Sequence, residues 1–312
     1  MSSEHTVPVP GDAVVVVWGV IAASIWGTSY VAAKQVVQWL PPIAAAAIRF
    51  AMVAVLLWVA KSFAPDRQWR TVDRGDWVGI ALAGLFLTSF QFALQYAGVG
   101  LTTASKTSII ANTRPIFVAV LSVLVLREAP TLRRVGGILL AFAGIAVLTT
   151  EGSLAGLTFR SEHLRGDLLI LCNAISGAIG LVLTKRVLNR YSAFQTLVLT
   201  QTFGALGLLP MGLTEIVRLG GFPAAPALPF LLLVYQAVFC TIVSHLLWNR
   251  VLGRIEASRA SVFLYFAPIV TTVLSVLLLD EELTWYLVAG ATLVIGGAYA
   301  TMSSSDAAAD QP

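Results

Sequence analysis

The sequence predicts an all-α polytopic membrane protein of ten transmembrane helices, arranged as two inverted five-helix repeats. Three observations predict it: the composition, the spacing of apolar runs and an internal repeat. Of the 312 residues, 57% are apolar and only 12% are charged, and the mean hydropathy is +0.84. Soluble domains carry about 25% charged residues. The composition therefore excludes a soluble single-core protein, a collagen-like chain, a disulfide scaffold and a disordered chain.

Apolar runs long enough to cross a bilayer, which takes about 20 residues, recur along the whole chain. The predicted spans are 13–35, 42–61, 76–98, 102–126, 132–150, 167–187, 194–214, 227–249, 257–279 and 284–302. No Lys or Arg precedes the first span, so we expect no cleaved secretory signal and a first run that stays as a helix.

Positive charges predict the orientation of these spans. With ten spans both termini lie on one side, and placing them in the cytoplasm puts 13 Lys and Arg in inside loops against five outside. This excess follows the positive-inside rule. We therefore expect a multi-pass protein of the cell inner membrane with cytoplasmic termini. The basic pI of about 9.3 reflects this topology, and nucleic acid is not an expected partner.

An internal repeat relates the two halves of the chain by a shift of 153 positions. Residues 104–131 align without a gap on 257–284, with 13 of 28 positions identical, including the pair Glu128 and Glu281. Five spans per half force opposite orientations, and the charges agree: the loop 127–134 holds three Arg, whereas its counterpart holds three acids. Inverted repeats are typical of secondary transporters that bind substrate near the midplane between halves.

The repeat also divides the chain into segments. We expect a first half over 13–150, an external linker over 151–166, a second half over 167–302 and a disordered cytoplasmic tail over 303–312. Glycine stripes in spans five and ten permit close helix packing, either within one chain or between chains. The oligomeric state is not predicted.

Four stretches resemble a known family. They are WGTSYVAAK at 26–34, the Arg-Phe pair at 49–50, ASKTSIIANTRPIFVAVLSVLVLRE at 104–128 and LLWNRVLGRIEASRASVFLYFAPIVTTVLSVLLLDE at 246–281. The chain resembles the EamA-type, ten-span branch of the drug/metabolite transporter superfamily along nearly its whole length. The resemblance implies membrane transport, and characterised relatives mostly export amino acids and metabolites. It says little about substrate. The chain departs from the family pattern at Arg114, where its own second half has Ala267.

Arg114 is the sharpest candidate for substrate binding. It lies about 15–18 Å inside the fourth span, too deep for its side chain to reach the interface. No carboxylate lies in the interior of a span to neutralise it, since all acids fall at termini, in loops or at helix ends, and a buried cation of this kind is a functional candidate. Two roles fit: the guanidinium binds a substrate carboxylate or phosphate, or it is structural and bonds helix carbonyls or Asn112.

Trp26, Tyr30 and Lys34 follow each other at intervals of four residues and therefore share one face of the first span. They form either a cavity wall with a cation at its mouth, or lipid-facing aromatics with an interfacial anchor. Trp26 is too deep for the interfacial aromatic belt.

The remaining polar residues within spans are weaker candidates. Gln91, Asn112 and Tyr265 are further candidate substrate-binding residues, and Tyr265 lies opposite Asn112 in the repeat register. Arg49, like Lys34 and His245, is expected to be a gating or structural charge. His245 is the one His within a span; it fits either proton coupling or a simple hydrogen-bonded role.

We therefore predict an exporter of amino acids or small carboxylated metabolites that works by alternating access. Its partners are a small-molecule substrate and the lipid bilayer. The alternative substrates are neutral or amphiphilic drug-like compounds. A membrane enzyme is a remote alternative, because Ser176 and His245 would lie at different depths for a nucleophile and its base. No catalytic residue, cofactor or metal site is expected.

Overall fold

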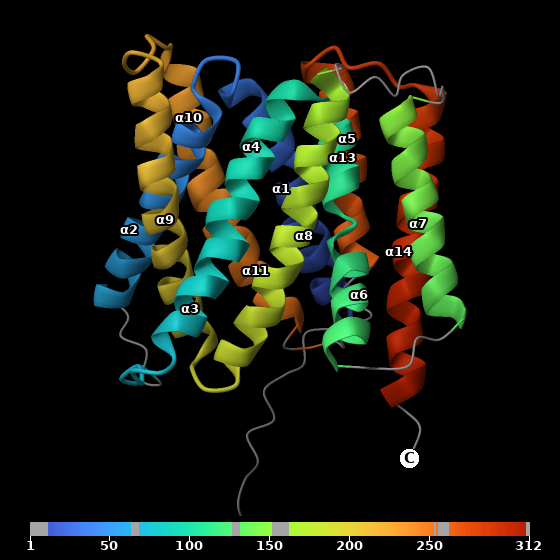
Figure 1. Ribbon diagram of the computed structural model, residues 1–312, viewed down its shortest axis with the longest axis horizontal. Helices are drawn as coiled ribbons and strands as arrows, with labels where there is room; N and C mark the ends of the chain where they lie inside the picture. The colour runs from blue at the N-terminus through green and yellow to red at the C-terminus, as the bar shows by residue number, and fades with distance from the viewer. Residues whose placement is uncertain are drawn as a thin grey trace, which may run out of the picture.

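The computed structural model describes residues 12–63, 69–126, 132–151, 162–252, 254 and 262–309. Within these residues all regular structure is helical, as the sequence predicts. Figure 1 shows long helices running side by side between an upper end, where α4 meets α5, and a lower end, where α14 finishes.

The elements coincide closely with the apolar runs of the sequence. In chain order they are α1 (Asp12–Val36), α2 (Pro42–Phe63), α3 (Trp77–Gly84), η1 (Leu85–Phe90), α4 (Gln91–Leu101), α5 (Ala104–Ala111), α6 (Arg114–Leu126), α7 (Leu132–Thr150), α8 (Glu162–Leu188), α9 (Ala193–Arg218), α10 (Ala227–Tyr235), η3 (Gln236–Val243), α11 (Ser244–Leu252), η4 (Val262–Tyr265), α13 (Phe266–Leu278) and α14 (Trp285–Ala309). Of the described residues, six helical stretches are long and apolar enough to cross a membrane, and three shorter apolar helices accompany them.

Two of the long stretches contain a π-helical segment. The segments are η1, which joins α3 to α4, and η3, which joins α10 to α11. The two segments are related by the internal repeat: the residues of η1, 85–90, correspond to residues 238–243, which lie within η3. A π turn inserts extra backbone into a helix and frees carbonyl groups, and it is frequent at functional sites.

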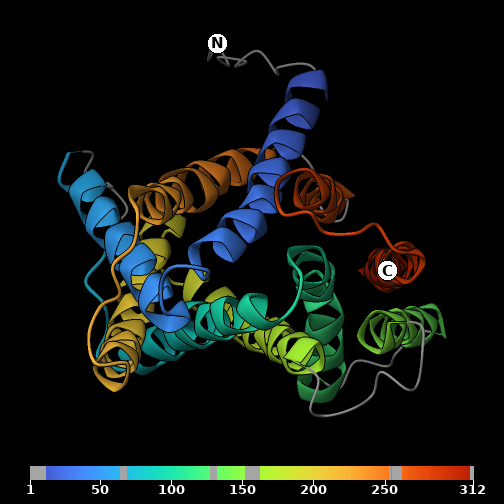
Figure 2. The same cartoon turned by 90° about the horizontal axis from the view of Figure 1, so that it is seen from above.

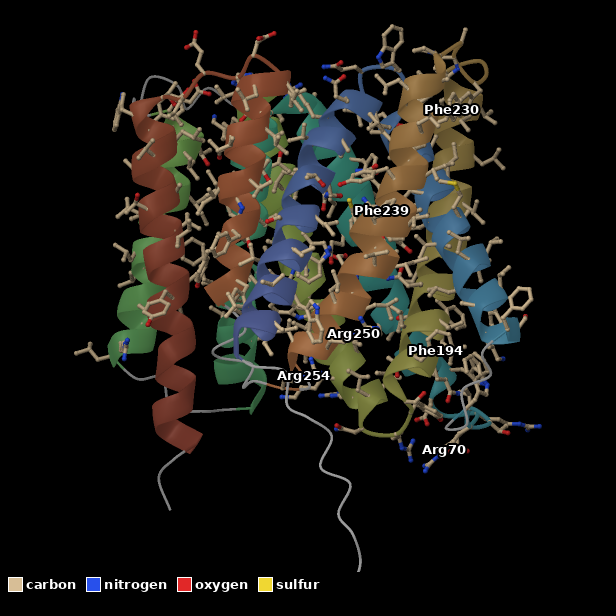
Figure 3. All side chains as sticks on the ribbon, turned by 180° about the vertical axis from the view of Figure 1, so that it is seen from behind. Arg70, Phe194, Phe230, Phe239, Arg250 and Arg254 are labelled. Atoms are coloured by element: carbon tan, nitrogen blue, oxygen red, sulfur yellow. The ribbon has the colours of Figure 1, made fainter. Side chains whose placement is uncertain are left out.

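A core of apolar side chains joins helices from both halves. Phe50 of α2, Tyr96 of α4, Leu208 of α9 and Leu233 of α10 belong to one buried cluster. The outer surface is apolar as well: on the face shown in Figure 3, Phe230 and Phe239 lie on α10 and η3 with 38% and 47% of their surface exposed. Large apolar groups on both sides of the helices are expected where lipid is the solvent.

Close packing of α7 on α14 explains the glycine stripes. A Cβ atom on Gly144 would lie 2.8 Å from the carbonyl oxygen of Gly290, and one on Gly297 would lie 2.5 Å from that of Gly137. The backbones therefore touch where no side chain intervenes. The stripes pack within one chain, and Figure 2 shows this pair at one edge of the bundle.

The C-terminal helix is longer than the sequence predicts. α14 continues to Ala309, into the segment 303–312 that we expected to be disordered. Three consecutive alanines end this helix, and alanine has the highest intrinsic helix propensity. Within the expected linker and tail, residues 152–161 and 310–312 lie outside the described residues.

Candidate functional site

A break in the fourth predicted span places Arg114 inside the bundle. α5 ends at Ala111, and Thr113 turns back so that its N–H and hydroxyl both donate to the Ile110 carbonyl, at 3.0 and 2.6 Å. Arg114 then begins α6, and the next residue, Pro115, has no N–H to donate. Figure 1 shows this junction near the middle of the bundle's height.

The Arg114 guanidinium is incompletely paired. With the Gln91 amide turned so that its oxygen faces the guanidinium, Arg114 Nη2 donates to that oxygen at 2.8 Å, and the amide nitrogen donates to the Leu87 carbonyl in η1 at 2.9 Å. Arg114 Nε has no hydrogen-bond partner among the described residues. The side chain is nevertheless partly exposed. A charged group with one described side-chain acceptor therefore lies at mid-height of the bundle.

Gly177 of α8 makes room for this guanidinium. A Cβ atom there would lie 2.5 Å from Arg114 Nε and 2.7 Å from the Gln91 side-chain amide. Only a residue without a side chain permits this approach. Nothing in the sequence distinguishes Gly177 from other glycines within spans.

Arg49 is more fully enclosed than Arg114, although its Nε also has no hydrogen-bond partner among the described residues. Its Nη1 donates to the hydroxyls of Ser29 at 3.3 Å and Tyr96 at 3.5 Å, and its Nη2 donates to Thr241 at 3.0 Å. The rings of Phe50 and Phe92 lie 5.1 and 5.2 Å from the guanidinium carbon, within cation–π range. Only 2% of Arg49 is exposed. Ser29 and Thr241 are further residues that the sequence analysis missed, because small hydroxyls occur throughout apolar helices.

Tyr30 and His245 lie within electrostatic range of both arginines. The His245 ring donates from Nδ1 to the Thr241 carbonyl and its centroid is 5.5 Å from that of Trp26. The ring centroids of Trp26 and Trp248 lie 5.3 Å apart. The site therefore has a cationic part and an aromatic part.

Three other predicted residues lie elsewhere. Lys34 donates to the carbonyls of Val99, Gly100 and Thr102 at 2.9, 3.3 and 2.6 Å, and so caps the C-terminus of α4. Asn112 donates to the Ser108 carbonyl of its own helix at 2.7 Å. Tyr265 packs beside a buried cluster that joins α6, α7 and α14.

The side chains of Ser176 and His245 contact other groups rather than each other. The Ser176 hydroxyl donates to the Phe86 carbonyl at 2.7 Å, and the His245 ring is occupied by Thr241 and Trp26. The arrangement lacks the nucleophile–base contact that hydrolysis requires.

A second polar group, missed by the sequence analysis, lies at the upper end. Lys106 Nζ contacts Glu151 at 2.7 Å and Asp167 at 3.5 Å, and the Thr102 hydroxyl donates to Asp167 at 2.6 Å. Partial burial opposes ionisation of Glu151, but the hydrogen bonds from Lys106 and His163 outweigh it and hold the pKa of Glu151 below its ordinary value. A hollow of about 190 Å³ adjoins this group, lined by Thr103, Lys106, Glu151, His163, Glu281, Glu282, Thr284, Tyr286 and Leu287.

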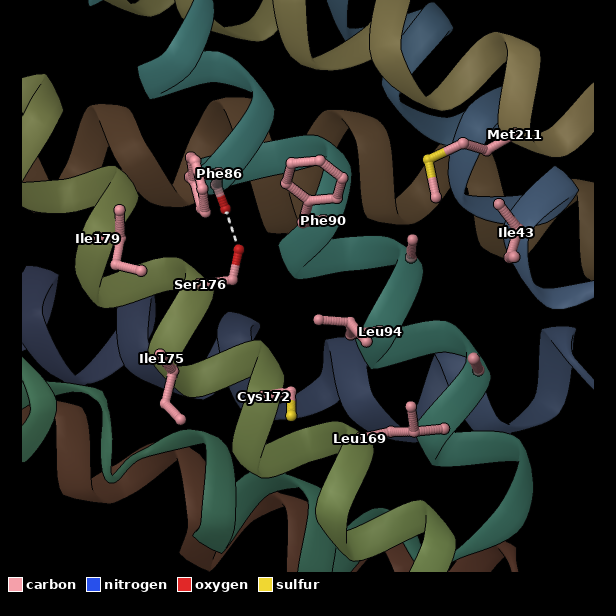
Figure 4. Close-up of a pocket in the computed structure, with 12 residues that line it drawn as sticks. Ile43, Phe86, Phe90, Leu94, Leu169, Cys172, Ile175, Ser176, Ile179 and Met211 are labelled. Carbon is pink, nitrogen blue, oxygen red and sulfur yellow. Dashed lines mark hydrogen bonds between the residues drawn. The ribbon is translucent and has the colours of Figure 1, made fainter.

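A larger hollow is apolar and lies on another face of α8. It measures about 470 Å³ and is lined by Ile43, Phe86, Phe90, Ala93, Leu94, Ala97, Leu169, Cys172, Ile175, Ser176, Ile179 and Met211 (Figure 4). Ser176 points into it, whereas its neighbour Gly177 contacts Arg114. This hollow therefore offers contacts for apolar groups and no charge.

Comparisons with known proteins agree on a family. The model of the EamA-like transporter family matches residues 13–150 and 164–303. An uncharacterized transporter of Archaeoglobus fulgidus is 31% identical over 284 residues, covering 90% of this chain and 97% of the relative. An Escherichia coli protein named "Probable amino-acid metabolite efflux pump" is 26% identical, covering 91% and 93%. A solved crystal structure with 19% identity superposes with a TM-score of 0.63 over 95% of this chain and 99% of the other.

Proposed function

We propose, from the premise that this chain belongs to the EamA-like transporter family, that it exports amino acids or small carboxylated metabolites. Membership makes it a membrane transporter. Two relatives, from Escherichia coli and Salmonella typhimurium, are named probable amino-acid metabolite efflux pumps, which supports this substrate class. The observation that carries the proposal is Arg114 itself, a partly exposed residue at mid-height of the bundle whose guanidinium has one described side-chain acceptor.

The proposed architecture is two inverted halves of five spans with the substrate site between them. The upper end faces outward and the lower end faces the cytoplasm. The positions of Arg70, Arg250 and Arg254 at the lower end support this orientation (Figure 3), because arginines gather on the cytoplasmic side. Alternating access then exposes the site to each end in turn.

In this site Arg114 binds the anionic end of the substrate. A guanidinium presents parallel N–H groups that match a carboxylate, and such charge-assisted bonds are stronger than neutral ones. Gln91 holds one nitrogen of Arg114, which orients the rest of the fork. Trp26 and Trp248 supply an apolar surface for the remainder of the substrate.

Counterflow into proteoliposomes tests the proposal, with a panel of labelled amino acids and organic acids as probes. We expect accumulation of at least one carboxylated solute by the wild-type protein and its loss in Arg114→Ala. Arg70→Ala is the matched control, because it removes the same charge from an exposed position. Equal transport of carboxylated solutes by wild type and Arg114→Ala would contradict the proposed role of Arg114.

A second candidate function is export of neutral or amphiphilic compounds. The partly exposed aromatic group of Trp26, His245 and Trp248 favours it, since flat apolar solutes stack on such rings. For this function, Trp26→Ala abolishes transport of a neutral amphiphile while Arg114→Ala leaves it intact.

A further inference from the structure

The carboxylate of Glu281, in the second half, binds the first turn of α5, in the first half. Glu281 Oε1 accepts the N–H of Ala104 at 2.6 Å. Its Oε2 accepts the N–H of Ser105 at 3.1 Å and the Ser105 hydroxyl at 2.7 Å. A carboxylate at a helix N-terminus is favoured both by these bonds and by the helix dipole.

The turn after α13 presents Glu281 to this helix. The N–H groups of Leu279 and Glu281 both donate to the Ser275 carbonyl, at 2.9 and 3.2 Å. Asp280 between them has a φ of +52°, the left-handed conformation that commonly ends helices. The carboxylate is therefore held on a defined turn.

The bonds from Glu281 complete the N-terminus of α5. Thr103 accepts the N–H of Lys106 at 3.1 Å, and the N–H of Thr107 is the first to bond within the helix, to the Thr103 carbonyl at 3.0 Å. The N–H groups of Ala104 and Ser105 would otherwise lack partners. When Glu281 withdraws, this helix end loses two of its acceptors.

α5 links this contact to the substrate site. All eight of its residues are buried, and it ends one short turn before Arg114. Eight helical residues span about 12 Å. α5 is thus a short buried connection between the contact with Glu281 and the guanidinium that we propose for substrate binding.

We propose that Glu281 is a latch that keeps the outward path closed by holding α5 against the second half, and that export requires its release. This inference rests on the proposed function, because it takes the upper end as the outside and the chain as an alternating-access carrier. Glu281 is a positioning residue: it acts through α5 and does not contact substrate.

Thiol accessibility tests the latch without any substrate. Cys172 and Cys240 are the two native cysteines; both are replaced by alanine, and Ser108→Cys is added as the reporter. Ser108 is completely buried one turn below the latch, and its hydroxyl bonds only its own helix. A membrane-impermeant methanethiosulfonate is added to right-side-out vesicles, and the labelling rate is measured.

We expect Glu281→Gln and Glu281→Ala to raise the labelling rate about tenfold, because a bond to a charged acceptor is lost. Ser105→Ala removes one of the three bonds and should give an intermediate rate. Glu282→Gln is the matched control: it neutralises the adjacent acid of the same hollow and should label at the wild-type rate.

Unchanged labelling in well-folded Glu281→Ala, or an equal increase in Glu282→Gln, would overturn the latch. If Glu281→Ala does not fold, Glu281→Gln and Ser105→Ala decide the question. Faster labelling combined with no counterflow of any carboxylated solute would sink the substrate proposal alone. Counterflow that Arg114→Ala abolishes, combined with unchanged labelling, would sink the latch alone.

Discussion

The surroundings of Arg49 and of Arg114 differ, although both arginines lie within apolar helices. Arg49 donates to three hydroxyls, lies against two aromatic rings and is 2% exposed. Arg114 has one described side-chain acceptor and a partly exposed surface. The Nε of both arginines lacks a partner among the described residues.

This difference teaches that burial of a charge does not by itself assign a function. A buried cation that hydroxyls and aromatic rings of the protein enclose stabilises the fold, whereas a less enclosed cation can bind an anion. The ion pairs described in this chain involve neither arginine. This contrast supports the proposal that Arg49 belongs to the scaffold and that Arg114 binds the substrate.

The largest effect on the fold is expected from Arg49→Ala. It leaves three hydroxyls without their donor and opens a cavity, which should lower the free energy of unfolding by about 2–4 kcal/mol. Denaturant unfolding in detergent micelles measures it, with Arg70→Ala as the surface control. If Arg49→Ala kept wild-type stability but lost transport, Arg49 and not Arg114 would be the substrate-binding arginine.

Arg114→Ala should reduce transport of carboxylated solutes by about 10- to 100-fold, the loss expected for charge-assisted bonds to one anion. Its unfolding free energy should change little, since few bonds within the protein are lost. Arg114→Lys keeps the charge without the planar fork and should transport at an intermediate rate. A large loss of stability in Arg114→Ala would place this arginine with the scaffold instead.

Gly177→Ala should displace the Arg114 guanidinium, because the new methyl group would lie 2.5 Å from Nε. We expect transport to fall about tenfold, since misplacement of a binding group is costly. Gly79→Ala is the matched control: nothing lies within 4 Å of its Cβ position, and alanine favours the helix. Equal rates for the two variants would show that the position of Arg114 is not critical.

Gln91→Leu should have the smallest effect. It removes the one acceptor that orients Arg114 but leaves the guanidinium in place, so the apparent affinity should weaken about two- to fivefold. Concentration-dependent counterflow measures the change. An effect as large as that of Arg114→Ala would indicate that Gln91 itself contacts the substrate.

Particular residues show how far the sequence could predict this site. Arg114 can be identified from the sequence alone, because an arginine without a neighbouring acid is rare in an apolar run. Helical spacing puts Trp26 and Tyr30 on one face, and in the structure Trp26 packs against His245 and Trp248, whereas Tyr30 lies within electrostatic range of both arginines. Lys34 looked like a cation at a cavity mouth, yet it bonds three carbonyls at the end of α4.

The sequence alone determined the helical class, the positions of the apolar helices and the presence of a deep charge, since hydropathy and periodicity act locally along the chain. Only the tertiary structure decided which arginine is the more enclosed, because the hydroxyl partners of Arg49, which are Ser29, Tyr96 and Thr241, come from three separate helices. The contact of Glu281 with α5 crosses 177 positions of the chain. Such contacts depend on how helices pack against one another, and helix periodicity carries no record of that packing.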